Sequence, residues 1–296
     1  MTRELQTLLK TTLLLLFLAT ASLYAGSMSA QEAVDRAVEY RDQNNYREAL
    51  KWYKISYEIE PTDQTAFNLA VAYQDVKDYS NAIKYYKEAF EKGVKLGETF
   101  AALNLGNLYA DSLKDYPNAI KWYKKAYKSD NSTGALYLAL LYDETLKDYP
   151  KAIEWYKKAY AMGNKDGARD LAIFYRKTLK DYPKAIEWYS KGVKEGYGKS
   201  INGLAYLYYD KKDYVKATAY ILLTINYGYG DTQSTLKYLK DEWNVDDATI
   251  LKAYEFQKTI DVPKHYYNEA FEKELHSNQS NTSKQEEPTH HRHGDK

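Results

Sequence analysis

The chain reads Asp148-Tyr-Pro-Lys-Ala152-Ile-Glu-Trp155-Tyr156 near its middle, and versions of this stretch recur along most of its length. The recurring tyrosine is spaced by 33, 37, 33, 33 and 32 residues. A nearly fixed period in this range is typical of a stack of similar repeats, each too small to bury its own apolar face. The pattern predicts six repeats, whose tyrosines are Tyr46, Tyr79, Tyr116, Tyr149, Tyr182 and Tyr214.

Each repeat is predicted to be a pair of amphipathic helices. In the fourth repeat, Leu138 and Tyr142 lie four residues apart on one helical face, and Ala152 and Tyr156 do the same on a second helix. Between the helices, an aspartate stands where it can cap the second helix, and a proline falls in that helix's first turn, where its missing N–H is harmless. The predicted caps are Asp115, Asp148 and Asp181, and the prolines are Pro117, Pro150 and Pro183.

The residue pattern of the two helices resembles the tetratricopeptide repeat. Repeats three to five are more similar to its relative, the Sel1-like repeat, because they carry Ala119-Ile-Lys-Trp122-Tyr, Ala152-Ile-Glu-Trp155-Tyr and Ala185-Ile-Glu-Trp188-Tyr. These three repeats also hold one extra residue between the helices: Tyr109 to Tyr116 spans seven residues, whereas Tyr73 to Tyr79 spans six. The resemblance covers about residues 30 to 228. It implies an all-α protein, an α-solenoid (right-handed superhelix) of about six to seven antiparallel helix pairs with a C-terminal capping helix.

The two ends of the chain differ from the repeats. Residues 1–25 have a charged start, a short apolar run and small residues at Ala21 and Ala25, which is the order of a cleaved secretory signal peptide. A segment kept as a membrane anchor is the alternative. We therefore expect an exported bacterial protein, periplasmic or secreted, with no membrane span after cleavage. After the repeats of 30–228, we expect a degenerate repeat and capping helices over 229–275 and a disordered polar tail over 276–296.

Composition argues against catalysis. The chain has no cysteine, and its histidines all lie beyond the six repeats, so thiol nucleophiles, His-based triads and His- or Cys-ligated zinc are excluded there. No phosphate-binding glycine loop is present. We therefore expect no enzyme, no cofactor and no metal site. If the chain were an enzyme, the carboxylate pair Asp143 and Glu144 would be its least implausible catalytic site. The tail histidines, His290, His291 and His293, would bind a transition metal weakly or form part of a solvated tail.

The charged and aromatic residues indicate which classes of partner the chain could bind. With 42 basic and 41 acidic residues, the chain has no overall attraction to nucleic acid or anionic lipid. Trp122, Trp155 and Trp188 recur at intervals of 33 residues, which suits packing between repeats better than sugar stacking. A glycan- or peptidoglycan-associated module that uses Trp and Tyr ladders nevertheless stays open as the alternative function. The end repeats of a solenoid also permit self-association.

The first helices offer a second stripe of residues, which we call the groove stripe. Its positions are counted from the inner tyrosine near the end of each first helix, which is Tyr109, Tyr142, Tyr175 or Tyr208. The stripe consists of the residues six and two positions before this tyrosine and the residues one and two positions after it. The resemblance implies that this stripe lines a concave groove for a peptide or protein segment. The expected function is a non-catalytic protein–protein interaction scaffold or adaptor in the cell envelope. The predicted groove residues are Asn107, Asp111, Leu140, Asp143, Glu144, Arg169, Ile173, Arg176, Lys177, Asn202, Tyr206 and Tyr209.

Overall fold

The computed structural model describes residues 28–93, 96–262 and 273. This part of the chain is all-α, with fourteen α-helices, two π-helical turns and no strand, which confirms the predicted fold class. Contacts divide the chain into two compact units, an N-terminal unit up to Leu146 and a C-terminal unit from Lys147 onward. The predicted signal peptide of 1–25 and the predicted tail of 276–296 lie outside the described residues, as do residues 263–275 of the predicted degenerate region apart from Lys273.

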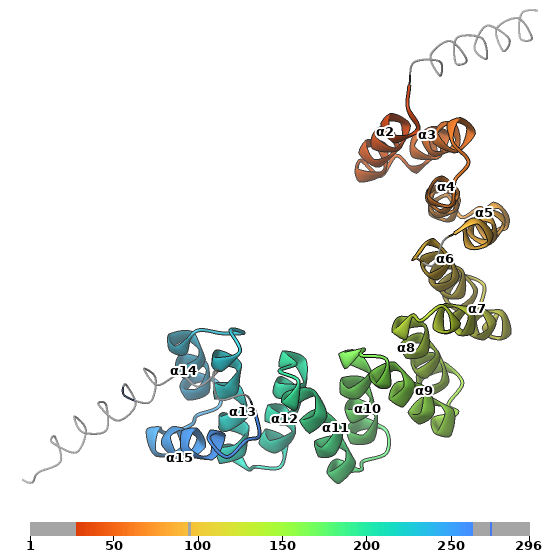
Figure 1. Ribbon diagram of the computed structural model, residues 1–296. Coiled ribbons are helices and arrows are strands. Elements are labelled where there is room, and N and C mark those ends of the chain that lie inside the picture. Colours follow the sequence, from red (N-terminus) through yellow and green to blue (C-terminus); the bar gives the residue numbers. More distant parts are fainter. Residues whose placement is uncertain (1–27, 94–95, 263–272, 274–296) are drawn as a thin grey trace, which may run out of the picture. The chain divides into compact units, whose positions relative to one another are not determined.

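The N-terminal unit contains the helices of the first three repeats and the first helix of the fourth. Consecutive helices pack against each other, as Figure 1 shows for α2 beside α3 and α4 beside α5. The elements are α2 (Ala30–Asp42), α3 (Tyr46–Ile59), α4 (Asp63–Asp75), α5 (Tyr79–Lys92), α6 (Leu96–Asn107), η1 (Leu108–Ser112), α7 (Tyr116–Lys128), α8 (Ser132–Leu140) and η2 (Leu141–Thr145).

The C-terminal unit begins with the second helix of the fourth repeat. The last two described helices of this unit lie in the predicted degenerate region, where Asp246 caps α15 and α15 packs on α13. The elements are α9 (Tyr149–Ala161), α10 (Lys165–Lys177), α11 (Tyr182–Lys194), α12 (Gly198–Asp210), α13 (Tyr214–Asn226), α14 (Thr232–Asp241) and α15 (Asp247–Gln257).

Every second helix begins in the same way. The side chains of the predicted caps Asp115, Asp148 and Asp181 each accept a hydrogen bond from the backbone N–H three residues later, and a proline follows at the second helical position. This arrangement satisfies one of the four N–H groups that a helix start leaves without a partner. The same cap is present at Asn45, Asp78 and Asp213.

The turn before each cap holds a conformation that the sequence pattern did not indicate. The residue preceding the cap has a positive φ, for example 64° at Lys77 and 54° at Lys114, although neither is glycine. This bend lets the cap residue's own N–H reach the carbonyl oxygen of the inner tyrosine, at 2.9 Å for Asp78 to Tyr73 and 2.8 Å for Asp115 to Tyr109. The bond ties the end of the first helix to the start of the second.

The extra residue of repeats three and four lies at the end of the first helix. There the helix widens into a π-helical turn, η1 in repeat three and η2 in repeat four, and the N–H of Leu113 bonds to the carbonyl of Leu108. Repeat five keeps one such wide bond, from the N–H of Leu179 to the carbonyl of Phe174. The seven-residue spacing therefore corresponds to a local widening of the helix, a feature often found at functional sites.

The core is built from small residues and tyrosines. Ala82, Ala119, Ala152 and Ala185 are fully buried, so the two helices of a repeat can approach closely. Tyrosines of the second helices, such as Tyr86 and Tyr189, are 1% exposed. Burial raises the pKa of both hydroxyl groups, because the charged form loses its water.

Candidate functional site

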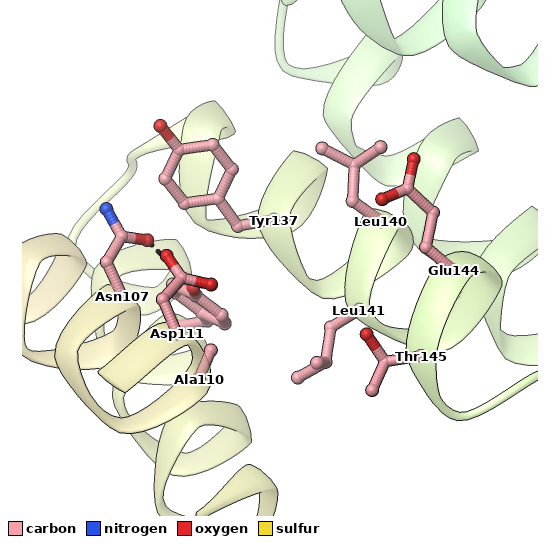
Figure 2. Close-up of a pocket in the computed structure, with 9 residues that line it drawn as sticks. Asn107, Ala110, Asp111, Tyr137, Leu140, Leu141, Glu144 and Thr145 are labelled. Atoms are coloured by element: carbon pink, nitrogen blue, oxygen red, sulfur yellow. Dashed lines mark hydrogen bonds between the residues drawn. The ribbon is translucent and has the colours of Figure 1, made fainter. Parts of the chain in front are cut away.

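A pocket lies on the first-helix side of repeats three and four, inside the N-terminal unit. Its volume is about 320 Å³. Figure 2 shows Asn107, Ala110 and Asp111 on one side, and Leu140, Leu141, Glu144 and Thr145 on the other. Four of these seven residues, Asn107, Asp111, Leu140 and Glu144, are predicted groove residues. Tyr123 and Tyr137 complete the lining.

The two π-helical turns supply most of the pocket. Ala110 and Asp111 belong to η1, and Leu141, Glu144 and Thr145 belong to η2. The first helix that leads into η1 packs tightly on the second helix of its repeat at Gly106. A Cβ atom at Gly106 would lie 2.5 Å from the ring of Tyr123, so only glycine fits there. The extra residue noted in the sequence thus marks the elements that form the site.

Tyr123 forms the back of the pocket. Its ring is 4% exposed and lies edge-on to Tyr137, with ring centroids 5.5 Å apart. Its hydroxyl donates a hydrogen bond of 2.8 Å to Oδ1 of Asn107. Burial raises the pKa of this hydroxyl, and the negative charge of Asp111 raises it further. Tyr123 therefore stays protonated and holds Asn107 in place.

The pocket is acidic. Asp111 and Glu144 are both exposed, and within the described residues neither forms an ion pair. No lysine or arginine is among the lining residues. Beside the polar Asn107 and Thr145, the wall has an apolar and aromatic part, formed by the half-buried side chains of Leu140 and Tyr137 and the buried Leu141. Such a site suits a partner group that is cationic at its end and apolar along its stem.

Asp143, the remaining predicted groove residue of repeat four, has a different position. It lies in η2 and is half-buried, but it does not line the pocket. The two positions six residues before the inner tyrosines, Leu103 and Leu136, are 7% and 8% exposed and belong to the core. The groove stripe is therefore narrower in these repeats than the helical periodicity indicated.

In the C-terminal unit, the predicted basic residues are largely paired within the chain. Arg169 contacts Oδ1 of Asp166 at 2.5 Å and Oδ1 of Asp170 at 2.6 Å. Burial raises the pKa of the Asp170 carboxyl, and the charge of Arg169 offsets only part of that rise. Arg176 contacts Asp210 at 3.3 Å. Of the three basic groove residues, Lys177 alone is exposed and has no ion pair in the described part of the chain.

The aromatic groove residues of repeat six pack against the C-terminal helices. The ring of Tyr209 lies 4.5 Å from that of Trp243, and the ring of Tyr206 lies 5.8 Å away. The hydroxyls of Tyr206 and Tyr238 are 3.2 Å apart. Burial and this hydrogen bond raise the pKa of Tyr238 to about 12. Tyr206 keeps 46% of its surface exposed, and the neighbouring Asn202 is exposed too. Ile173 of repeat five is half-buried.

The recurring tryptophans are packing residues. Trp122, Trp155 and Trp188 are 5%, 8% and 8% exposed. Each ring is also covered by the lysine three residues later, with the ammonium nitrogen 4.0, 4.1 and 3.5 Å from the ring centre. Because these rings are nearly closed to solvent, they offer no open face on which a sugar could stack.

The described residues form neither a metal-binding cluster nor a membrane-spanning helix. In this part of the chain, no three His, Cys, Asp or Glu side chains gather where they could hold a metal ion. The tail histidines, His290, His291 and His293, lie outside it. None of the described helices combines the length and the apolar character that crossing a membrane requires.

Two family models match the chain. The tetratricopeptide repeat model matches residues 67–135, and the Sel1 repeat model matches residues 39–58, 133–164 and 166–197. The chain is therefore a repeat protein that contains both tetratricopeptide and Sel1 repeats, as its sequence indicated. Repeats of these two families generally mediate protein–protein interactions, and the scaffolds built from them are typically not enzymes.

One solved structure supports the fold, and two others are reported with it. The chain is similar to human IFIT1, crystallised as a dimer with PPP-AAAA, at 19% identity over 78% of this chain and 54% of that one, with a TM-score of 0.51. A Sel1 repeat protein from Oxalobacter formigenes shares 22% identity over 73% of this chain and 87% of its own, with a TM-score of 0.45. The pilF protein of Pseudomonas aeruginosa shares 19% identity over 78% and 97%, with a TM-score of 0.48. No curated protein matches the chain.

Proposed function

We propose that this chain is a non-catalytic adaptor that binds a segment of a partner protein on the first-helix side of its repeats. The pocket of repeats three and four is the observation that carries the proposal. It lies at four predicted groove positions and combines apolar walls with exposed carboxylates that have no partner within the described chain. A surface of this kind suits an extended or helical protein segment.

The geometry favours a protein partner over a glycan. The glycan alternative depended on an open ladder of aromatic rings, and the three recurring tryptophans are buried and covered by lysines. In repeat six, Tyr206 and Tyr209 are engaged with Trp243 and Tyr238. The pocket residues, by contrast, present carboxylates and leucines, which suit amino-acid side chains.

We also propose that the protein acts in the cell envelope after export, in the periplasm or as a secreted protein. The basis is the sequence of residues 1–25, with Arg3 and Lys10 before an apolar run that ends in small residues. N-terminal sequencing of the protein recovered from the periplasm and from the culture medium tests this proposal. A start after Ala21 or Ala25 supports export, and recovery of the uncleaved chain from the cytoplasm contradicts it.

Site-specific photocrosslinking in living cells tests the adaptor proposal. The photoreactive residue p-benzoylphenylalanine replaces Thr145, which is exposed at the pocket, and in a matched control it replaces Lys121, which is exposed on α7. We expect a discrete protein adduct from position 145 and none from position 121. Adducts of equal yield at both positions, or none at position 145, would contradict binding at this surface.

A further inference from the structure

An acidic residue on the groove stripe recurrently pairs with an arginine of the preceding repeat. In two places, the residue after an inner tyrosine is an arginine, and it pairs with the acid two residues after the inner tyrosine of the next repeat. Arg41 contacts Asp75 with two nitrogens, Nε to Oδ2 at 2.7 Å and Nη2 to Oδ1 at 3.4 Å. Arg176 occupies the equivalent position and contacts Asp210 through one nitrogen, at 3.3 Å.

Repeats three and four hold the same acids without the arginines. Asp111 and Glu144 occupy the acidic position, but the arginine position of the preceding repeat is Gln74 in one case and Ala110 in the other. The side-chain oxygen of Gln74 accepts a hydrogen bond of 2.9 Å from the hydroxyl of Tyr86. Ala110 is too short to reach any carboxylate. Of these two positions without an arginine, Ala110 lines the pocket and Gln74 does not, so the pocket lacks the intramolecular arginine that would face Glu144.

The pocket has the volume and the lining for one long side chain. Its volume of about 320 Å³ lies at the lower end of the range for small-molecule pockets, roughly 300–1,000 Å³. Leu140 and Leu141 provide an apolar wall, Tyr137 provides a ring, and Ala110 leaves open the space that an arginine at its position would fill. The carboxylates of Asp111 and Glu144 lie in the same lining.

We propose that this pocket binds an arginine side chain of the partner segment, which takes the place of the missing intramolecular arginine. The proposal rests on the function proposed above and adds the chemistry of the partner. Arginine fits better than lysine because its planar guanidinium pairs with a carboxylate through two nitrogens, as Arg41 does with Asp75, and it can lie against an aromatic ring. The acidic pocket also repels phosphate groups and acidic peptides.

Methyl NMR of the full chain tests the proposal with a defined probe. The probe is the capped pentapeptide acetyl-Gly-Leu-Arg-Leu-Gly-amide, and its control carries citrulline, which has the shape of arginine without the charge. We expect the arginine peptide to shift the methyl signals of Leu140 and Leu141. We also expect it to bind at least about tenfold more tightly than the citrulline peptide, because it forms charge-assisted hydrogen bonds. Equal binding of the two peptides, or shifts confined to other leucines, would overturn the proposal.

Three variants locate the binding. Asp111→Asn combined with Glu144→Gln removes both charges and should abolish the preference for arginine. Ala110→Arg supplies the missing intramolecular arginine and should block the pocket. Glu91→Gln makes a similar change of charge at an exposed position of α5, outside the pocket, and should bind the arginine peptide like the wild type. Wild-type affinity in the double variant would overturn the proposal, and circular dichroism verifies that each variant is folded.

The experiment separates this proposal from the proposed function. If the adaptor function is correct and the arginine chemistry is wrong, the adduct from position 145 will persist in the Asp111→Asn, Glu144→Gln background. If both are correct, that adduct will disappear together with the binding of the arginine peptide. If position 145 gives no adduct even in the otherwise wild-type chain, the adaptor proposal itself fails.

Discussion

Repeats three and four, in the N-terminal unit, differ from repeats five and six in how the charges of the groove stripe are used. In repeats three and four of the N-terminal unit, Asp111 and Glu144 surround a pocket and have no ion pair in the described chain. In the C-terminal unit, Arg169 lies between two aspartates and Arg176 pairs with Asp210. The charges of the groove stripe are therefore paired within the fold in repeats five and six, as they are between Arg41 and Asp75, and stay without an ion pair in repeats three and four of the described chain. A charge on a groove stripe indicates binding only when no neighbouring repeat neutralises it.

The largest effect is expected from removing the paired arginine. Arg169→Met leaves the carboxylate of Asp170, whose side chain is 12% exposed, without its main counter-charge. We expect a loss of about 1.5–3 kcal/mol in the free energy of unfolding, which is typical of a buried charged group that loses its partner. Urea denaturation measures the loss, and hydrogen exchange should show it first in α10.

Lys177→Met is the matched control in the same helix. Lys177 is exposed and has no ion pair among the described residues, so its replacement should change the stability by no more than about 0.5 kcal/mol. Equal losses in the two variants would show that the arginine is not paired as described, and the contrast between the units would disappear.

The next largest effect, expected in both units, comes from removing a helix cap. Asp115→Ala in the N-terminal unit and Asp213→Ala in the C-terminal unit each remove the cap of a second helix. Each should lower the free energy of unfolding by about 1 kcal/mol, because a backbone N–H loses its acceptor. Asparagine caps nearly as well, so Asp115→Asn should keep most of the stability in thermal denaturation. A much larger loss in one unit would mean that capping also differs between them.

A smaller effect is expected from the ion pair between the first two repeats. A double-mutant cycle on Arg41 and Asp75 should give a coupling of about 0.2–1 kcal/mol, because the arginine side chain is 43% exposed and screened by solvent. The coupling should shrink as salt is added. A second cycle, with Ala110→Arg and Glu144→Gln, should create a coupling of the same size where the natural chain has none. Its absence would argue against the equivalence of the two positions.

The smallest effect is expected in the pH dependence of the stability that the helix caps contribute. A hydrogen bond from Lys184 lowers the pKa of Asp181, and one from Lys151 does the same for Asp148. Because the pKa of each cap is lower in the folded state, its charge stabilises the fold above the unfolded value, about 3.9, and this contribution disappears as the pH falls through the folded value. In an acid titration followed by circular dichroism, Asp181→Asn should lose less stability than the wild type. Identical titrations would contradict this assignment.

Most of the fold was predictable because the period of the repeat is strong. The helix pairs, the caps at Asp115 and Asp148, and the buried tryptophans all follow from side-chain spacing and capping chemistry, which are local. The left-handed residue before each cap was not predictable, because lysine at Lys77 or Lys114 carries no signal for a positive φ. The turn imposes that conformation through its hydrogen bond to the inner tyrosine.

The candidate site was predictable in part. Helical periodicity selected Asn107, Asp111, Leu140 and Glu144, which line the pocket. It did not select Tyr137, although this residue lies one helical turn before Leu140 and Leu141 on the same face. It also did not indicate the π-helical turns that supply most of the pocket. The seven-residue spacing was the available signal for those turns. The pairing of Arg169 and Arg176 depends on neighbours in space, and only the structure reveals it.

The central claim is that Asp111 and Glu144 bind a partner and do not contribute to the free energy of unfolding. Equilibrium urea unfolding of the Asp111→Asn, Glu144→Gln double variant tests this claim most directly. We predict a free energy of unfolding equal to that of the wild type within about 0.5 kcal/mol, because both side chains are exposed and neither forms an ion pair in the described chain. A loss of more than about 1.5 kcal/mol would show that the two carboxylates are paired within the protein, and would contradict the claim.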